Sequence, residues 1–233
     1  MRLFDTSSRV RAAVAVAMLA ALAAAACANG TDRRDSAATA AVAAATRDSA
    51  ATPAIVTPAA APDSFRVTFT TSRGPFVVQV NRDWAPRGAD RFYELVQAKF
   101  YDDDRFFRVV PHFVAQFGIN DKPKVNDEWD AKRIVDDSVR HTNARGTLVF
   151  ASEGLNTRSH QLFINLVDNP QLDAMQFAPI GKVVNGMSVV DSLYDGYGEQ
   201  PEQHFIQTLG NSYLNRVFPK LDYIKTARIS AAP

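Results

Sequence analysis

The sequence lacks the residues that several kinds of catalysis require. Among 233 residues there is one cysteine, Cys27, so no disulfide bond can form within the chain. The four histidines are widely spaced, and no H-E-x-x-H or Cys–His pattern occurs, which predicts no metal site. The P-loop, the G-x-G-x-x-G fingerprint and the G-x-S-x-G elbow are missing as well. We therefore expect no cofactor and no covalent mechanism.

The charge balance, the histidine positions and the lack of an oligomer signal exclude further kinds of function. The chain carries 26 Lys and Arg against 25 Asp and Glu, and a net charge of +1 gives no reason to expect a nucleic acid partner. Ser159 and His160 are sequence neighbours that would point to opposite faces of a strand, so they are not expected to form a catalytic pair. No feature indicates an oligomer, and we expect a monomer.

The N-terminus has the features of an export signal. Three arginines precede about fifteen apolar residues, a stretch too short to span a membrane comfortably. Cys27 follows directly and resembles the lipidated cysteine of bacterial lipoproteins, although Ala24 stands where those proteins usually have leucine. We expect residues 1–26 to be a signal peptide and Cys27 to be lipidated, which would anchor the protein to a membrane of the bacterial cell envelope, in the periplasm. The alternative is ordinary cleavage beside Cys27.

The next segment is of low complexity. Residues 27–63 consist mostly of Ala, Thr, Ser, Pro and Asp, and the motif RDSAAT occurs twice. Such a composition cannot bury enough apolar surface to offset the entropy of ordering. We interpret it as a flexible tether, which places the folded domain at residues 64–233.

The remainder predicts a mainly β fold. Apolar and polar residues alternate in SFRVTFT and FVVQV, and further strand-type runs follow as far as LDYIKTARI. Helical spacing occurs after Pro86 and again in GMSVVDSLYDG, whereas KVNDEWD is typical of a loop. Many short strands with two helices predict a closed antiparallel barrel or a sandwich capped by those helices.

One strand-type run, FFRVVPHFVAQFG, contains a cation, Arg108, and an amide, Gln116. A set of apolar residues with amides and one arginine suits a reaction that breaks no covalent bond, such as rotation about an X–Pro amide. A guanidinium is always charged and could donate to the prolyl nitrogen of the twisted amide. Alternation breaks at Pro111, so we expect two strands joined at 110–112.

Three blocks resemble the cyclophilin family. FYDDDRFFRVVPHFVAQFG is similar to the family pattern F-Y-D-G-x-x-F-H-R-V-I-P-x-F-M-x-Q-G-G. TLVFASEGLNTRSHQLFINL and LDAMQFAPIGKVVNGMSVVD are similar to the second and third blocks, and all three occur in order. The resemblance implies the closed eight-stranded antiparallel cyclophilin barrel capped by two helices and peptidyl-prolyl cis-trans isomerase activity on proline-containing segments of exported proteins.

The resemblance also implies roles for single residues. It makes Arg108 the catalytic residue, and it gives substrate-binding positions to Phe113, Gln116, Ala151, Gln161, Phe163, Leu172 and Phe177. Among these, Phe113 would be the floor of the proline pocket, and Gln116 would orient the substrate backbone.

The chain departs from the family pattern at several positions. Gln171 stands where many members have Trp, and Phe107 stands where the pattern has His. The residues after Asp191 extend beyond the common core, and we expect 210–213 to pack against the barrel. These departures leave a second interpretation open, in which a non-catalytic module of this family binds proline-containing segments as a chaperone or scaffold.

Overall fold

The computed structural model describes residues 53–230. The predicted signal peptide and Cys27 lie outside the described residues, as does most of the predicted tether. Within 53–230, none of the helices is long and apolar enough to cross a membrane.

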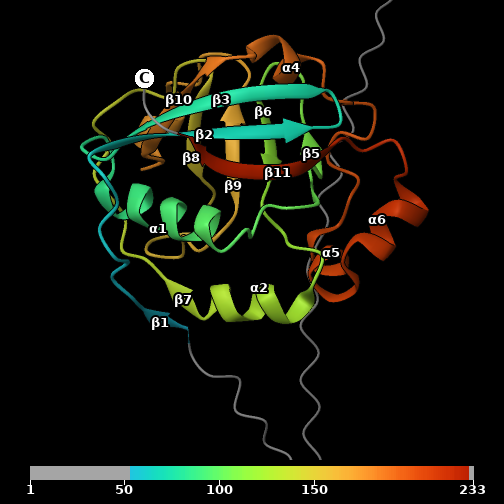
Figure 1. The fold of residues 1–233 in the computed structure, drawn as a ribbon, viewed down its shortest axis with the longest axis horizontal. Helices are drawn as coiled ribbons and strands as arrows, with labels where there is room; N and C mark the ends of the chain where they lie inside the picture. Colours follow the sequence, from blue (N-terminus) through green and yellow to red (C-terminus); the bar gives the residue numbers. More distant parts are fainter. Residues whose placement is uncertain (1–52, 231–233) are drawn as a thin grey trace, which may run out of the picture. The chain divides into compact units, whose positions relative to one another are not determined.

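A single nine-stranded sheet dominates the fold (Figure 1). Its strands in spatial order are β4 (Asp104–Arg105), β11 (Tyr223–Ser230), β2 (Ser64–Thr71), β3 (Gly74–Asn81), β10 (Pro179–Asn185), β8 (Thr147–Phe150), β9 (Leu162–Asn165), β6 (Val114–Phe117) and β5 (Arg108–Val109). Every neighbouring pair in this sheet is antiparallel, which confirms the predicted mainly β, antiparallel class.

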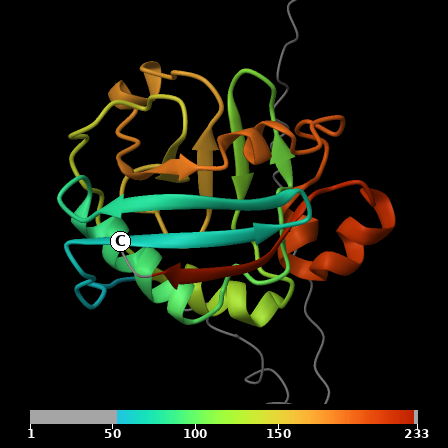
Figure 2. The same ribbon diagram turned by 45° about the horizontal axis from the view of Figure 1, so that its top comes forward.

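The two edge strands of this sheet are joined by the chain itself. Only Phe106 and Phe107 separate β4 from β5, and two residues span at most about 7 Å. The two edges must therefore lie close together, so the sheet is curled (Figure 2). The sheet has nine strands where eight were predicted, and its two edge strands are consecutive in the chain.

The interior of the curled sheet is filled by alternate residues of its long strands. In β2 and β3 every second side chain is buried, as the period of two requires. Phe69 pairs with Phe76 across these strands, and their rings stack with centroids 4.7 Å apart. The buried residues that the two strands contribute are Phe65, Val67, Phe69, Phe76, Val78 and Val80.

The prediction of two helices was incomplete. Helices α1 (Pro86–Gln97) and α4 (Met187–Asp191) are present where the periodicity placed them. The expected loop KVNDEWD instead lies within helix α2 (Pro123–Asp130), and α3 (Gln171–Ala174), α5 (Gln203–Leu209) and α6 (Asn211–Val217) are additional. In α2 only Asn126 is buried, so its sequence shows no apolar period.

The predicted tether boundary at residue 63 also requires correction. Ala54 and Ile55 form β1, which pairs in parallel with β7 (Lys132–Arg133). Ala61 is buried, and its N–H donates to Asp90 Oδ1 at 2.8 Å. Backbone hydrogen bonds do not depend on side-chain type, so the low-complexity composition did not indicate that these residues are ordered.

Helices α5 and α6 form a helical extension, residues 196–221, at one side of the sheet (Figures 1 and 2). Its apolar core consists of Phe107, Ile119, Ile206, Tyr213, Leu214, Phe218 and Leu221. Gly210, between the helices, has a positive φ, and a Cβ there would lie 2.0 Å from the carbonyl oxygen of Asp121. The expected packing of residues 210–213 against the barrel is confirmed. Phe107, which stands where the family pattern has His, packs against the extension.

Candidate functional site

Four neighbouring strands place four side chains in a row. Arg108 of β5 is opposite Gln116 of β6, Gln116 is opposite Phe163 of β9, and Phe163 is opposite Val149 of β8. Directly opposed residues of antiparallel strands point to the same face of the sheet. The row therefore carries a cation, an amide and two apolar side chains on one face.

Side-chain hydrogen bonds connect the polar members of the site. Arg108 Nη1 donates to Gln116 Oε1 at 3.3 Å, and Gln116 Nε2 donates to Gln161 Oε1 at 2.9 Å. These contacts fix the orientation of both amides, because each uses a defined oxygen or nitrogen. The Arg108 side chain is 24% exposed, so its guanidinium is partly desolvated but still accessible.

Aromatic and aliphatic side chains form the floor of the site, beside these hydrogen-bonded polar residues. The guanidinium carbon of Arg108 lies 5.5 Å from the centre of the Phe113 ring, within the range of a cation–π contact. Phe163 and Phe177 meet edge to face with centroids 5.7 Å apart, and Leu172 is buried against Phe163. Val114 and Val149 belong to the same apolar cluster.

Local backbone structure explains how Phe113 and the residues of the 170s reach the site. Strand β5 ends at Val109 and β6 begins at Val114, which confirms the predicted break at 110–112, and His112 in the turn has φ 58°. Buried Asn169 donates from Nδ2 to the carbonyl oxygen of Phe113 at 3.1 Å. Phe177 N–H donates to Leu172 O at 3.1 Å across helix α3.

These groups surround a cavity of about 250 Å³, which we call the apolar cavity. Its lining contains Arg108, Phe113, Val114, Gln116, Ala151, Ser152, Phe163, Leu172, Met175 and Phe177. The structure thus brings together all the predicted site residues except Gln161 and Cys27. Val114, Ser152 and Met175 were not among the predicted site residues, because no local pattern distinguishes them.

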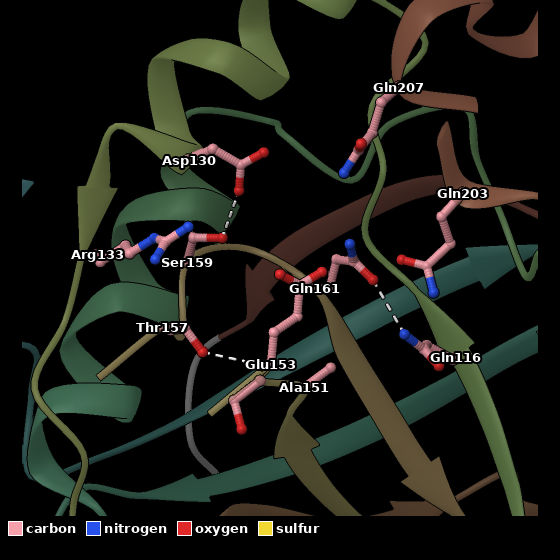
Figure 3. A pocket seen from close by; sticks show the side chains of 11 residues that line it. Gln116, Asp130, Arg133, Ala151, Glu153, Thr157, Ser159, Gln161, Gln203 and Gln207 are labelled. Atoms are coloured by element: carbon pink, nitrogen blue, oxygen red, sulfur yellow. Dashed lines mark hydrogen bonds between the residues drawn. The ribbon is translucent and has the colours of Figure 1, made fainter. Parts of the chain in front are cut away.

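Gln161 lines a second, polar cavity of about 300 Å³ (Figure 3). The two cavities share Gln116, Ala151 and Ser152, so they adjoin. Gln203 and Gln207 of α5 form part of the wall of the polar cavity, which means that the helical extension contributes to the site. No local sequence pattern predicts this contact, because it joins residues far apart in the chain.

The polar cavity contains no activated nucleophile. Ser159 Oγ donates to Asp130 Oδ1 at 2.8 Å, and His160 is fully buried, with Nδ1 2.6 Å from Gly118 O. Burial alone would raise the pKa of Asp130, but its contacts with His160, Ser159 and Arg133 together outweigh burial and lower the pKa below its usual range. Asp130 is therefore a poor base. Within residues 53–230, no cluster of three or more His, Cys, Asp and Glu side chains could hold a metal ion.

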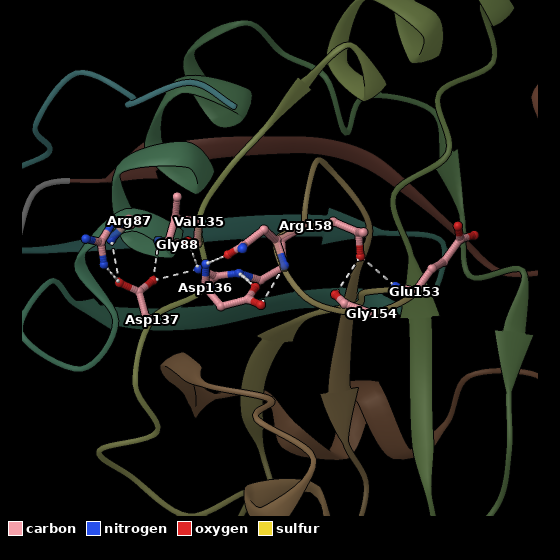
Figure 4. A network of polar contacts seen from close by, with 10 residues as sticks. Arg87, Gly88, Val135, Asp136, Asp137, Glu153, Gly154 and Arg158 are labelled. Carbon is pink, nitrogen blue, oxygen red and sulfur yellow. Dashed lines mark hydrogen bonds and ion pairs between the residues drawn. The ribbon is translucent and has the colours of Figure 1, made fainter. Parts of the chain in front are cut away.

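Arg158 anchors the loop that connects β8 to β9 and carries Ala151 and Gln161 (Figure 4). Its side chain is buried, with Nε 3.0 Å from Asp136 Oδ1 and Nη2 3.1 Å from Asp137 Oδ2. Asp137 also accepts the N–H of Gly88 at 2.9 Å. Sequence reasoning missed this network, because an arginine in a loop-type run is usually exposed.

The sequence was compared with protein families and with curated proteins. The model of the family described as cyclophilin type peptidyl-prolyl cis-trans isomerase matches residues 66–211. The chain is 34% identical over 129 residues to peptidyl-prolyl cis-trans isomerase ppi1 of Schizosaccharomyces pombe, covering 53% of this chain and 81% of the relative. It is also 34% identical over 141 residues to peptidyl-prolyl cis-trans isomerase A of Dickeya dadantii, covering 58% and 73%.

Solved structures share the same fold. A crystal structure of a cyclophilin type peptidyl-prolyl cis-trans isomerase from Cryptosporidium parvum superimposes with a TM-score of 0.54 at 20% identity, covering 73% of this chain and 99% of that chain. A second crystal structure of that protein, in the presence of the dipeptide Ala-Pro, gives a TM-score of 0.53 at 21% identity, covering 72% and 99%.

Proposed function

The chain belongs to the cyclophilin-type peptidyl-prolyl cis-trans isomerase family and is an isomerase of this class, and we propose that it acts through an arginine donor beside a proline-binding cavity. The observation that carries the mechanism is the position of Arg108, whose guanidinium lies at the rim of the apolar cavity and over Phe113.

Rotation about an X–Pro bond requires little from a protein except binding and one well-placed donor. The barrier is about 18–20 kcal/mol, and the unaided reaction takes tens to hundreds of seconds. When the amide twists, resonance is lost and the prolyl nitrogen becomes a better hydrogen-bond acceptor. Arg108 donates to this nitrogen in the twisted state but not in the planar one, so it stabilises the transition state selectively.

The apolar cavity suits a proline ring. Phe113, Phe163 and Leu172 supply apolar walls, and their burial of the ring removes water from around the reacting amide. Gln116 and Gln161 then offer amide groups to the substrate backbone. Because the polar cavity adjoins the apolar one, a bound polypeptide extends from the proline into it.

A direct assay tests this function. The full-length protein should accelerate isomerisation of a short proline-containing peptide well above the uncatalysed rate. Phe113→Ala should reduce kcat/KM by about 10-fold or more, mainly through KM, since an apolar contact in a binding pocket contributes about 1–3 kcal/mol. Wild-type protein that shows no acceleration would contradict the enzymatic function.

One observation favours the second candidate function, non-catalytic binding of unfolded segments. Leu155 and Met175 are 78% and 62% exposed, and both line a further cavity that shares Phe177 with the apolar cavity. Exposed apolar side chains beside a binding cavity favour contact with extended apolar polypeptide. If the protein binds the peptide without accelerating it, and Phe113→Ala weakens that binding, this second function holds.

The clients that we propose are exported proteins, and the support comes from the sequence of the N-terminus. A basic start, an apolar stretch and Cys27 together favour export followed by lipidation. Intact-mass spectrometry of the mature protein from a bacterial membrane fraction should show an N-terminus at Cys27 that carries acyl chains. Cys27→Ala should release the protein from that fraction. An unmodified N-terminus near residue 27 would instead support simple cleavage.

A further inference from the structure

We propose that Glu199, on the helical extension, is a positioning residue that holds Arg108 in the orientation needed for donation to the prolyl nitrogen. The inference rests on the proposed function of Arg108 and adds to it a second residue that is remote in sequence. The sequence comparison with the family pattern offered no role for Glu199, which lies beyond the three matching blocks.

The contact between the two side chains is specific in its atoms. Glu199 Oε1 accepts from Arg108 Nε at 2.7 Å and lies 2.5 Å from Arg108 Nη2. One carboxylate oxygen therefore occupies the fork between two N–H groups along the side edge of the guanidinium. On the other side, Nη1 donates to Gln116. The guanidinium plane is thus held at both edges, with Phe113 against its face.

This arrangement leaves donors for a substrate. A guanidinium has five N–H groups, and the contacts with Glu199 and Gln116 use three of them: one on Nε, one on Nη2 and one on Nη1. The remaining two are one N–H on Nη1 and one on Nη2, and neither is the Nε–H that Glu199 accepts. Glu199 therefore orients Arg108 without taking up these two donors, which distinguishes positioning from inhibition.

The extension is fixed where it approaches Arg108. Phe107, the residue before Arg108, is buried in the apolar core of the extension. Tyr197, two residues before Glu199, packs its ring on Phe218 with centroids 5.1 Å apart. The turn that carries Glu199 is closed by hydrogen bonds from Gly198 N to Asp195 O and from Gln200 N to Tyr197 O. Glu199 thus projects from an ordered turn anchored to the same strand as Arg108.

Folding stability does not account for this pair. The Glu199 side chain is 64% exposed, and exposed ion pairs contribute little to the free energy of unfolding. The orientation of Arg108 should instead affect the catalytic rate, because a misplaced catalytic group slows the reaction even when the fold is intact. The two consequences can be separated by experiment, since Glu199 variants should fold normally.

The test compares three variants of the full-length protein in the prolyl isomerisation assay. Glu199→Ala should lower kcat about 3- to 10-fold with KM nearly unchanged, because the loss affects the transition state. Glu199→Gln should retain most of the activity, since its amide oxygen can accept from the same two donors. Glu202→Ala removes another exposed carboxylate of the extension, one without a side-chain capping bond, and should match wild type.

NMR provides a readout that a merely structural role would not move. The Nε–H resonance of Arg108, assigned by its absence in Arg108→Lys, should shift in Glu199→Ala and not in Glu202→Ala.

The outcomes separate this inference from the function on which it rests. If wild type is inactive, the proposed function fails first. If wild type is active and Arg108→Ala is not, but Glu199→Ala equals or exceeds wild type, only the positioning role is overturned. A higher rate in Glu199→Ala would mean that the carboxylate restrains Arg108 against catalysis.

Discussion

Arg108→Ala is expected to lower kcat/KM about 10²- to 10³-fold, the usual effect of removing one positioned donor from a site that stabilises a transition state electrostatically. The loss should be in kcat more than in KM, because the prolyl nitrogen accepts strongly only when the amide is twisted. Stability should change little, since Arg108 is paired with the exposed Glu199. Coupled-proteolysis or NMR exchange rates, together with thermal unfolding curves, measure both quantities.

Two further variants sharpen this result. Arg108→Lys keeps the charge but loses the planar fork that meets both Glu199 and Gln116, so it should remain severely impaired. Arg216→Ala removes an exposed arginine from the last turn of α6 and should match wild type. If Arg108→Ala kept more than about half of the wild-type kcat/KM, the arginine mechanism would be wrong and desolvation of the proline ring alone would have to carry the catalysis.

The predictable part of the fold is the part in which local pattern and burial agree. In β2 and β3 the alternation of Phe and Val with polar residues follows from burial of one face, so their strands are evident in the sequence. The break at Pro111 was likewise predictable, because proline cannot continue the ladder. Arg108 and Gln116 were conspicuous only as polar residues in an apolar run.

The assembly of the site depends on information that local pattern does not contain. Arg108, Gln116 and Phe163 fall in one row only after β5, β6 and β9 pair in the observed register. The family resemblance supplied this long-range information for the residues within its blocks. It supplied none for Glu199 or for the wall formed by α5, because these lie in the extension and reach the site through tertiary packing.

Arg158 is an example in which local sequence pattern also fails to identify a residue that stabilises the fold. Its sequence context predicts a loop, yet its side chain is only 4% exposed and bridges Asp136 and Asp137, which come from a segment more than twenty residues earlier. A guanidinium can be buried when its donors meet carboxylates and carbonyl oxygens, and Arg158 also donates to Val135 O at 2.5 Å. The residue ties the loop that carries Ala151 and Gln161 to the segment before it.

Arg158→Ala should therefore lower the free energy of unfolding by about 3–5 kcal/mol, the usual cost of breaking a buried ion pair by removing one partner. Asp137, with a side chain only 2% exposed, keeps the N–H bonds from Gly88 and Arg87 and the exposed Arg87 guanidinium at 3.6 Å, but it loses its closer and buried charge partner at 3.1 Å. Urea unfolding followed by circular dichroism measures the change. Because the same loop lines both cavities, isomerase activity should fall as well, even at urea concentrations far below the midpoint of unfolding.

The matched control is Arg145→Ala, which removes a surface partner of Asp191. Both side chains of that pair are more than 40% exposed, so the variant should lose no more than about 1 kcal/mol. A loss of under about 1 kcal/mol for Arg158→Ala as well would mean that water replaces the guanidinium at Asp136 and Asp137 without penalty. Arg158→Lys separates charge from geometry: an ammonium restores the charge but cannot reach both carboxylates and Val135 O in one plane, so it should recover only part of the stability.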